Sequence, residues 1–248
     1  MVNVIHKSVS VYLLLLLFIC LPCANVIASP ETKGLKKGTP HFIENKGQIT
    51  DQFGKQRTDI DYTMKAGGLV IFIGPGHMHY QWNKPAISAI DNEVKSFDAY
   101  RLDVILDGAN TGVRPVAEQR ADYYENYYTA NLQGVVAGSY DKLVYKNIYD
   151  NIDWVVYMHD GGLKYDFLVH AGGNPDNIRI RYDGASDMET KSGDIIAVTP
   201  YGQVTEKAPF TYYAHNKQPV ASEYVLSGNT IGFNIGEHNA PIVIDPSL

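Results

Sequence analysis

Residues 152–169 constrain the fold more than any other part of the chain, because two signals together predict a β-hairpin there. Apolar and polar residues alternate on both sides of a central turn, which is typical of strands with one buried face. The turn, residues 159–162, contains Asp160, Gly161 and Gly162, which tolerate the positive φ angles that a tight hairpin requires. The expected buried side chains are Ile152, Trp154, Val156 and Met158 in the first strand and Leu163, Tyr165, Phe167 and Val169 in the second.

Short runs of the same kind recur along most of the chain, separated by Gly, Pro, Asn or Ser. No window shows a sustained apolar pattern at helical period. The sequence therefore predicts an all-β fold, an antiparallel β-sandwich, with a two-lobed arrangement as the alternative. Residues 121–132 lack a clean period and are expected to form a loop with short strand pieces. Further strands are predicted at residues 61–65, 68–74, 77–82, 97–107, 143–145, 194–199, 202–206, 210–215, 219–226, 230–235 and 242–244.

The first 28 residues are predicted to be a signal peptide. Lys7 supplies a positive charge, residues 11–21 form a short apolar core, and small residues precede a cleavage site before Ser29. We expect a linker at residues 29–40, a β-sandwich domain at residues 41–248, and export to the medium or the cell surface, with the periplasm as the alternative. Lipid attachment at Cys23 is disfavoured, because Cys20 and Pro22 stand where Leu and a small residue are expected.

Composition excludes several classes of function. The only cysteines, Cys20 and Cys23, lie in the predicted signal peptide, so the mature chain would have neither disulfides nor thiol chemistry. Removing Lys7 from the 21 basic residues leaves 20 against 27 acidic ones, a net charge of −7. This acidic balance disfavours nucleic acid as a partner. No other stretch is apolar enough to predict a membrane span after cleavage.

Six short motifs occur in a fixed order: ENKGQ at 44–48, YKNIYDNIDW at 145–154, LKYDF at 163–167, AGGNPDNIRIRYDGA at 171–185, Ala208-Pro209, and VIDP at 243–246. Together they resemble the uncharacterised β-rich, DUF7948-like domain at the N-terminus of large secreted proteins, many from Bacteroidetes. Later parts of those proteins carry SBBP β-propeller repeats and PKD-like domains. The resemblance implies an extracellular or cell-surface module with no known catalytic residues.

The chain departs from the family pattern at two turns. Asn151-Ile152-Asp153 replaces the usual Gly-Ile-Asp, and residues 129–132 replace a Gly-containing turn. The sequence also stops at Leu248, where repeats would begin. The resemblance therefore leaves two expectations open, a stand-alone member of the family or a fragment of a longer product.

Four tyrosines, Tyr123, Tyr124, Tyr127 and Tyr128, form the densest aromatic cluster in the sequence. Flat rings exposed on a loop can stack against sugars, which predicts a glycan-binding surface. The competing interpretation, which we favour, is that the rings cap an open end of the sandwich.

Asp153 and Asp166 lie at similar distances from the hairpin turn, which predicts that they are close across the strand pair. Two carboxylates about 5–10 Å apart can hydrolyse a glycosidic bond, and they can also bind calcium. Structural ion pairing with Lys164 and Arg179 is the interpretation we favour.

His77 and His79 alternate on a predicted strand, so both rings are expected on one face, as metal ligands would be. No third ligand lies nearby in the sequence, so we predict no metal site and no cofactor. The common hydrolase, phosphate-binding and EF-hand motifs do not occur. The sequence predicts a non-enzymatic module with a structural or adhesive role and glycans or other surface proteins as partners. A carbohydrate-binding or glycan-processing domain is the alternative.

Overall fold

The computed structural model describes residues 40–87, 94–129 and 132–246. The predicted signal peptide and nearly all of the predicted linker lie outside these residues. The described part consists of antiparallel strands with one short 3-10 turn, η1 (Pro175–Asn177), which confirms the all-β prediction. Within this part, no helix has the length and apolar character that a bilayer span requires.

The strands, in chain order, are β1 (Phe42–Glu44), β2 (Tyr62–Ala66), β3 (Leu69–Gly74), β4 (His77–Ile87), β5 (Val94–Leu106), β6 (Val116–Thr129), β7 (Leu132–Tyr149), β8 (Ile152–His159), β9 (Gly162–Val169), β10 (Ile180–Asp183), β11 (Asp187–Lys191), β12 (Asp194–Thr199), β13 (Gly202–Glu206), β14 (Phe210–Tyr213), β15 (Pro219–Val220), β16 (Ser222–Ser227), β17 (Thr230–Ile235) and β18 (Ile242–Asp245).

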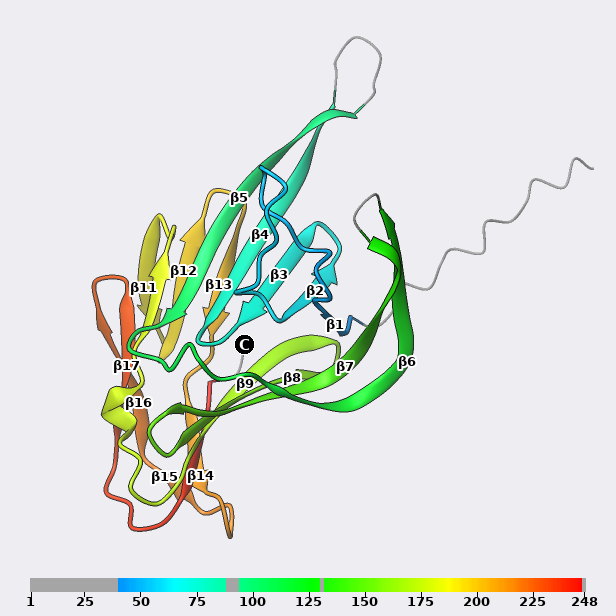
Figure 1. The fold of residues 1–248 in the computed structure, drawn as a ribbon. Helices are drawn as coiled ribbons and strands as arrows, with labels where there is room; N and C mark the ends of the chain where they lie inside the picture. The colour runs from blue at the N-terminus through cyan, green and yellow to red at the C-terminus, as the bar shows by residue number, and fades with distance from the viewer. Residues whose placement is uncertain (1–39, 88–93, 130–131, 247–248) are drawn as a thin grey trace, which may run out of the picture. The chain divides into compact units, whose positions relative to one another are not determined.

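Most strands of the described part belong to one 15-stranded sheet in which β7 is shared by two halves and also pairs with β6. One half runs from β7 through β8, β9, β18 and β14 to β15, and the other through β1, β2, β3, β4, β5, β10 and β17 to β16 (Figure 1). The end strands β15 and β16 follow one another in the chain, separated by Ala221 alone. The sheet therefore nearly closes on itself between β15 and β16. The single strand predicted at residues 219–226 is in fact these two strands.

The β8–β9 hairpin is formed as predicted. His159 pairs with Gly162, and the two residues between them, Asp160 and Gly161, have φ angles of 50° and 77°. Positive φ at both positions is the signature of a type I′ turn, whose twist suits a hairpin. The predicted core side chains are buried, except that Met158 is half-buried.

The core lies between the two halves of the large sheet. The ring of Phe167 on β9 lies 6.1 Å from that of Phe233 on β17, so the two halves contact each other directly. The three-stranded sheet β11-β12-β13 adds Ile195, Ala197 and Val204 to the same core. Strand β11 was not predicted, because its side chains are mostly exposed and carry no apolar alternation.

The prediction of a loop with short strand pieces at residues 121–132 is wrong for residues 121–129 and 132, and residues 130–131 lie outside the described part. This region contains the end of β6, which pairs with β7 from Val116 to Thr129 in a long hairpin (Figure 1). Both faces of much of this hairpin are exposed, so its residues show no alternation between apolar and polar types. The pattern that normally reveals a strand is therefore absent from the sequence.

Candidate functional site

We define the aromatic arm as residues 120–129 and 132–140 of the paired strands β6 and β7. Its two strands are in antiparallel register, with Tyr124 opposite Gly138 and Asn126 opposite Val136. Because successive side chains of a strand point to opposite faces, the four predicted tyrosines divide into two pairs. The structure therefore does not bring them together as one cluster.

The inner face of the arm carries Tyr123, which is 52% exposed, and the half-buried Tyr127. Both hydroxyl groups donate hydrogen bonds to Glu125. Lys65 on β2 lies 3.5 Å from the same carboxylate. Burial, followed by the hydrogen bond to Glu125, raises the pKa of the half-buried Tyr127. His41 stacks on Tyr123 with ring centroids 6.2 Å apart. These contacts give the inner pair a structural role in attaching the arm to the body of the sheet.

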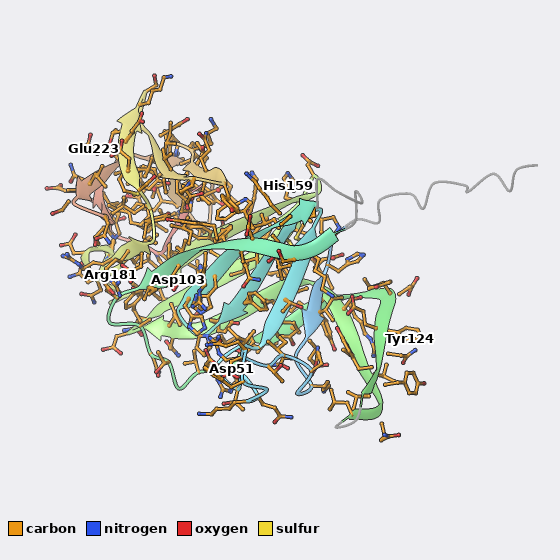
Figure 2. All side chains as sticks on the ribbon, turned by 90° about the horizontal axis from the view of Figure 1, so that it is seen from above. Asp51, Asp103, Tyr124, His159, Arg181 and Glu223 are labelled. Atoms are coloured by element: carbon orange, nitrogen blue, oxygen red, sulfur yellow. The ribbon has the colours of Figure 1, made fainter. Side chains whose placement is uncertain are left out.

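The outer face of the arm carries Tyr124 and Tyr128, which are 55% and 77% exposed. Figure 2 shows Tyr124 projecting from the hairpin, away from the rest of the sheet. Val136, on the neighbouring strand opposite Asn126, is 52% exposed. Among the described residues, only β7 pairs with β6, so no strand covers the other edge of β6. Two flat rings, an aliphatic side chain and an open strand edge thus form one surface.

Asp153 and Asp166 are not directly opposite each other. Asp153 pairs in register with Leu168, and Asp166 pairs with Val155. The buried Asp153 accepts a hydrogen bond from the backbone of Asn147 at 2.8 Å and lies 2.9 Å from Nε2 of His170.

Asp166 accepts a hydrogen bond from the hydroxyl of Tyr157 at 3.1 Å. Burial and the nearby Asp245 raise the pKa of Asp166 to about 6, although Tyr157 and Lys164 act in the opposite direction. Each carboxylate thus has its own local partner, and this arrangement favours a structural role over a catalytic pair.

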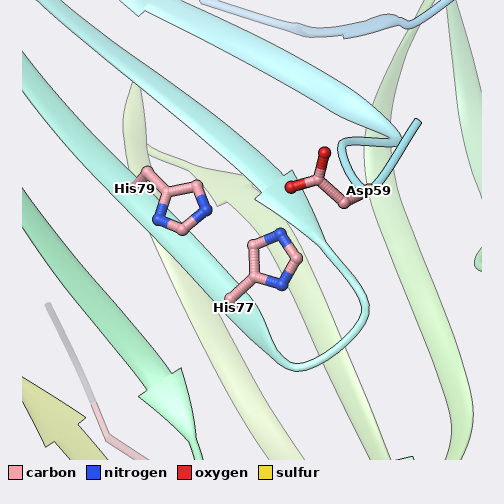
Figure 3. A group of neighbouring side chains, drawn as sticks. All are labelled: Asp59, His77 and His79. Atoms are coloured by element: carbon pink, nitrogen blue, oxygen red, sulfur yellow. The ribbon is translucent and has the colours of Figure 1, made fainter. Parts of the chain in front are cut away.

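His77 and His79 lie on one face of β4, with ring centroids 4.6 Å apart. The structure adds a third group, the carboxylate of Asp59, from the segment that precedes β2 (Figure 3). One ligand atom from each of the three residues lies within 4.8 Å of the others. The β2–β3 hairpin separates Asp59 from the histidines in the sequence, and no local motif marks it, so sequence reasoning missed it.

Charged side chains surround these three residues. Arg57 donates to both carboxylate oxygens of Asp59, and its hydrogen bond lowers the pKa of Asp59 to about 2 against the effect of burial. Burial and the neighbouring His79 lower the pKa of His77 to about 4, which keeps its ring neutral at neutral pH. Behind His79, Asp103 on β5 lies 2.8 Å from Nδ1 and is paired with Arg101. The cluster therefore presents an anionic carboxylate beside a neutral imidazole.

The domain of unknown function DUF7948 matches residues 42–247, which contain every described strand. The chain belongs to the DUF7948 family. This match confirms the family that the six motifs indicated, and the family description names no activity. No curated protein and no solved structure was found to match the DUF7948 chain.

Proposed function

We propose that this DUF7948 domain is an exported, non-enzymatic β-sandwich module with an adhesive role, and that the outer face of the aromatic arm is its contact surface. The exposure of Tyr124, Tyr128 and Val136 on one face is the observation that carries this proposal. Aromatic side chains bury much area at little conformational cost, which is why they dominate the energetics of protein interfaces. The signal-like segment at residues 1–28 supports export to the medium or the cell surface.

The partner that fits this surface best is an extended segment of another surface protein. The open edge of β6 offers backbone donors and acceptors to an added strand, while the rings beside it offer contacts for side chains. Natural proteins usually protect such edges, because an open edge invites pairing with another chain. The resemblance to N-terminal domains of large repeat-containing secreted proteins supports the same setting.

Replacing both outer tyrosines, Tyr124→Ala and Tyr128→Ala together, is expected to reduce adhesion at least about tenfold, because two interface anchors are lost. The assay measures attachment between cells that display the full chain, exported by its own leader, and a layer of the same cells. Phe210→Ala is the matched control, since Phe210 is an aromatic residue that is 53% exposed on β14. The proposal would be contradicted if cells attach only when the chain is present and attach equally well with the double variant. It would also be contradicted if the chain did not reach the cell surface.

Carbohydrate binding is the second candidate function, because Tyr124 and Tyr128 present flat rings on the same face of the arm. Sugar rings stack on such side chains through their apolar faces. On a glycan array, this candidate predicts binding that is lost with Tyr128→Ala and kept with Phe210→Ala, an exposed aromatic residue on β14 outside the arm. Absence of binding across many glycan classes would count against it and favour a protein partner.

A further inference from the structure

We propose that Asp59, His77 and His79 form a binding site for a divalent transition-metal ion of the Zn²⁺ type. Two imidazoles and one carboxylate are a common protein ligand set for zinc. His79 is 7% exposed, whereas the side chain of Asp59 is 49% exposed, so the cluster reaches from the interior to the surface. Figure 3 shows both rings and the carboxylate gathered where the segment before β2 passes the start of β4.

The strongest single indication is the Nε2 atom of His77, which is buried and has no hydrogen-bond partner among the described residues. A buried polar atom without a partner costs free energy unless something else satisfies it. A metal ion bound to Nε2 would satisfy this atom, and the ring proton would then be on Nδ1.

The residue opposite His77 on β3 is Gly74, and its missing side chain leaves space next to this Nε2 atom. A Cβ atom at Gly74 would lie 2.5 Å from Nε2 of His77 and 2.1 Å from the backbone oxygen of Asp59. Glycine thus lets the Asp59 segment approach the histidine. The ligand atoms lie within 4.8 Å of one another, and zinc ligands at tetrahedral angles are about 3.4 Å apart, so binding shortens these separations by up to about 1.4 Å. The half-exposed side chain of Asp59 can make this movement.

Asp103 orients the second histidine. Nδ1 of His79 lies 2.8 Å from Oδ1 of Asp103 and 3.0 Å from Nη2 of Arg101, which also donates to Oδ2 of Asp103. The carboxylate can only accept, so the shorter contact places the proton on Nδ1 and leaves Nε2 free. Metal-binding histidines commonly have a carboxylate behind them, because it fixes the tautomer and the direction of the ring. Arg101 holds Asp103 in turn, with Nε 2.5 Å from Oδ1.

The chemistry of the ligands selects the ion. Imidazole nitrogens suit zinc, cobalt and nickel, whereas calcium and magnesium prefer sites made entirely of oxygen.

Arg57 and Arg101 are balanced by Asp59 and Asp103, so the surroundings carry no net positive charge that would repel a cation. Each oxygen of Asp59 has a second lone pair, so the carboxylate can contact the metal while Arg57 remains bonded. Three protein ligands leave a fourth position for water or for a group from another molecule.

Titration of the full chain with Zn²⁺ by calorimetry, and with Co²⁺ by visible absorption, tests the site. Cys20 and Cys23 are replaced by serine in every variant, so that their thiols cannot bind the metal. We expect one ion per chain, and an affinity at least about tenfold weaker in His77→Phe and in Asp59→Asn. The matched control is His159→Phe, because His159 is an exposed histidine at the end of β8, outside the cluster.

The proposal is overturned if zinc binds with the same affinity to His77→Phe and to the parent chain, or if the parent chain binds no zinc at millimolar concentration. Circular dichroism confirms that each variant is folded. Should His77→Phe fail to fold, Asp59→Asn decides the question, since this exposed residue keeps its shape and loses only a charged ligand. Unchanged zinc affinity in a folded Asp59→Asn variant would also exclude the three-ligand site.

Discussion

At pH 8 the Glu206→Gln variant is expected to be about 3 kcal/mol more stable to unfolding than the wild-type protein, and near pH 4 the two are expected to be equally stable. Glu206, at the end of β13, is 1% exposed. Burial raises its pKa to about 7, although the hydroxyl of Tyr182 partly offsets this by donating a hydrogen bond of 2.5 Å. The carboxyl group is therefore protonated in the folded protein over a pH range in which it is ionised in the unfolded chain.

The direction of the effect follows from the two pKa values. The unfolded carboxyl loses its proton near pH 4.5 and the folded one near pH 7. The contribution of Glu206 to the free energy of unfolding is therefore largest below pH 4.5. It falls as the pH rises from 4.5 to 7 and is constant above pH 7. Each pKa unit between the two states corresponds to about 1.4 kcal/mol, which gives about 3 kcal/mol in total. Glutamine stays neutral over this pH range, and its amide oxygen can still accept the hydrogen bond from Tyr182.

Urea unfolding at pH 4, 6 and 8, followed by tryptophan fluorescence, measures this difference. Asp166, whose pKa is raised to about 6, changes stability in the same direction, but its contribution cancels when the two proteins are compared at one pH. Parallel stability profiles for wild type and Glu206→Gln would show that the buried carboxyl does not titrate as proposed. A loss of stability in the variant at pH 8 would have the same meaning.

Much of the fold could be predicted from the sequence because its signals are local. The alternation around Trp154 and the turn at Asp160-Gly161 depend on neighbouring residues only, and both are confirmed. Strands β12, β13 and β17 begin and end at the predicted residues for the same reason. The order of strands could not be predicted. It depends on which edges of β7 are used by β1, β6 and β8, and no single segment encodes that choice.

The candidate sites were only partly predictable. The tyrosines of the aromatic arm were visible as a cluster, but their division into two faces requires the β6–β7 register. The spacing of His77 and His79 correctly placed both rings on one face. Asp59 was invisible, because the β2–β3 hairpin must form before its carboxylate reaches the histidines. Contacts made through a folded hairpin leave no periodic signal in the sequence.

Trp154→Ala is expected to reduce the free energy of unfolding by about 3–5 kcal/mol, because it removes one of the largest buried side chains. Trp154 lies on β8, between β7 and β9, and is 1% exposed. Its ring centroid is 5.2 Å from that of Tyr145 on β7 and 6.3 Å from that of Tyr165 on β9. The cavity left by alanine would lie among aromatic rings that cannot close over it without leaving their own contacts.

Trp154→Phe separates the loss of volume from the loss of a polar atom. The Nε1 atom of Trp154 is buried and has no hydrogen-bond partner in the part of the chain that the structure describes, so removing it breaks no bond there and removes an unsatisfied donor. We therefore expect phenylalanine to cost much less than alanine, whereas Val225→Ala, at a residue 51% exposed on β16, should change stability by less than about 0.5 kcal/mol. Guanidinium unfolding followed by circular dichroism measures all three, since tryptophan fluorescence itself is altered. If Trp154→Ala cost no more than Val225→Ala, the β8–β9 hairpin would not be the centre of the core, because its largest side chain would be dispensable there.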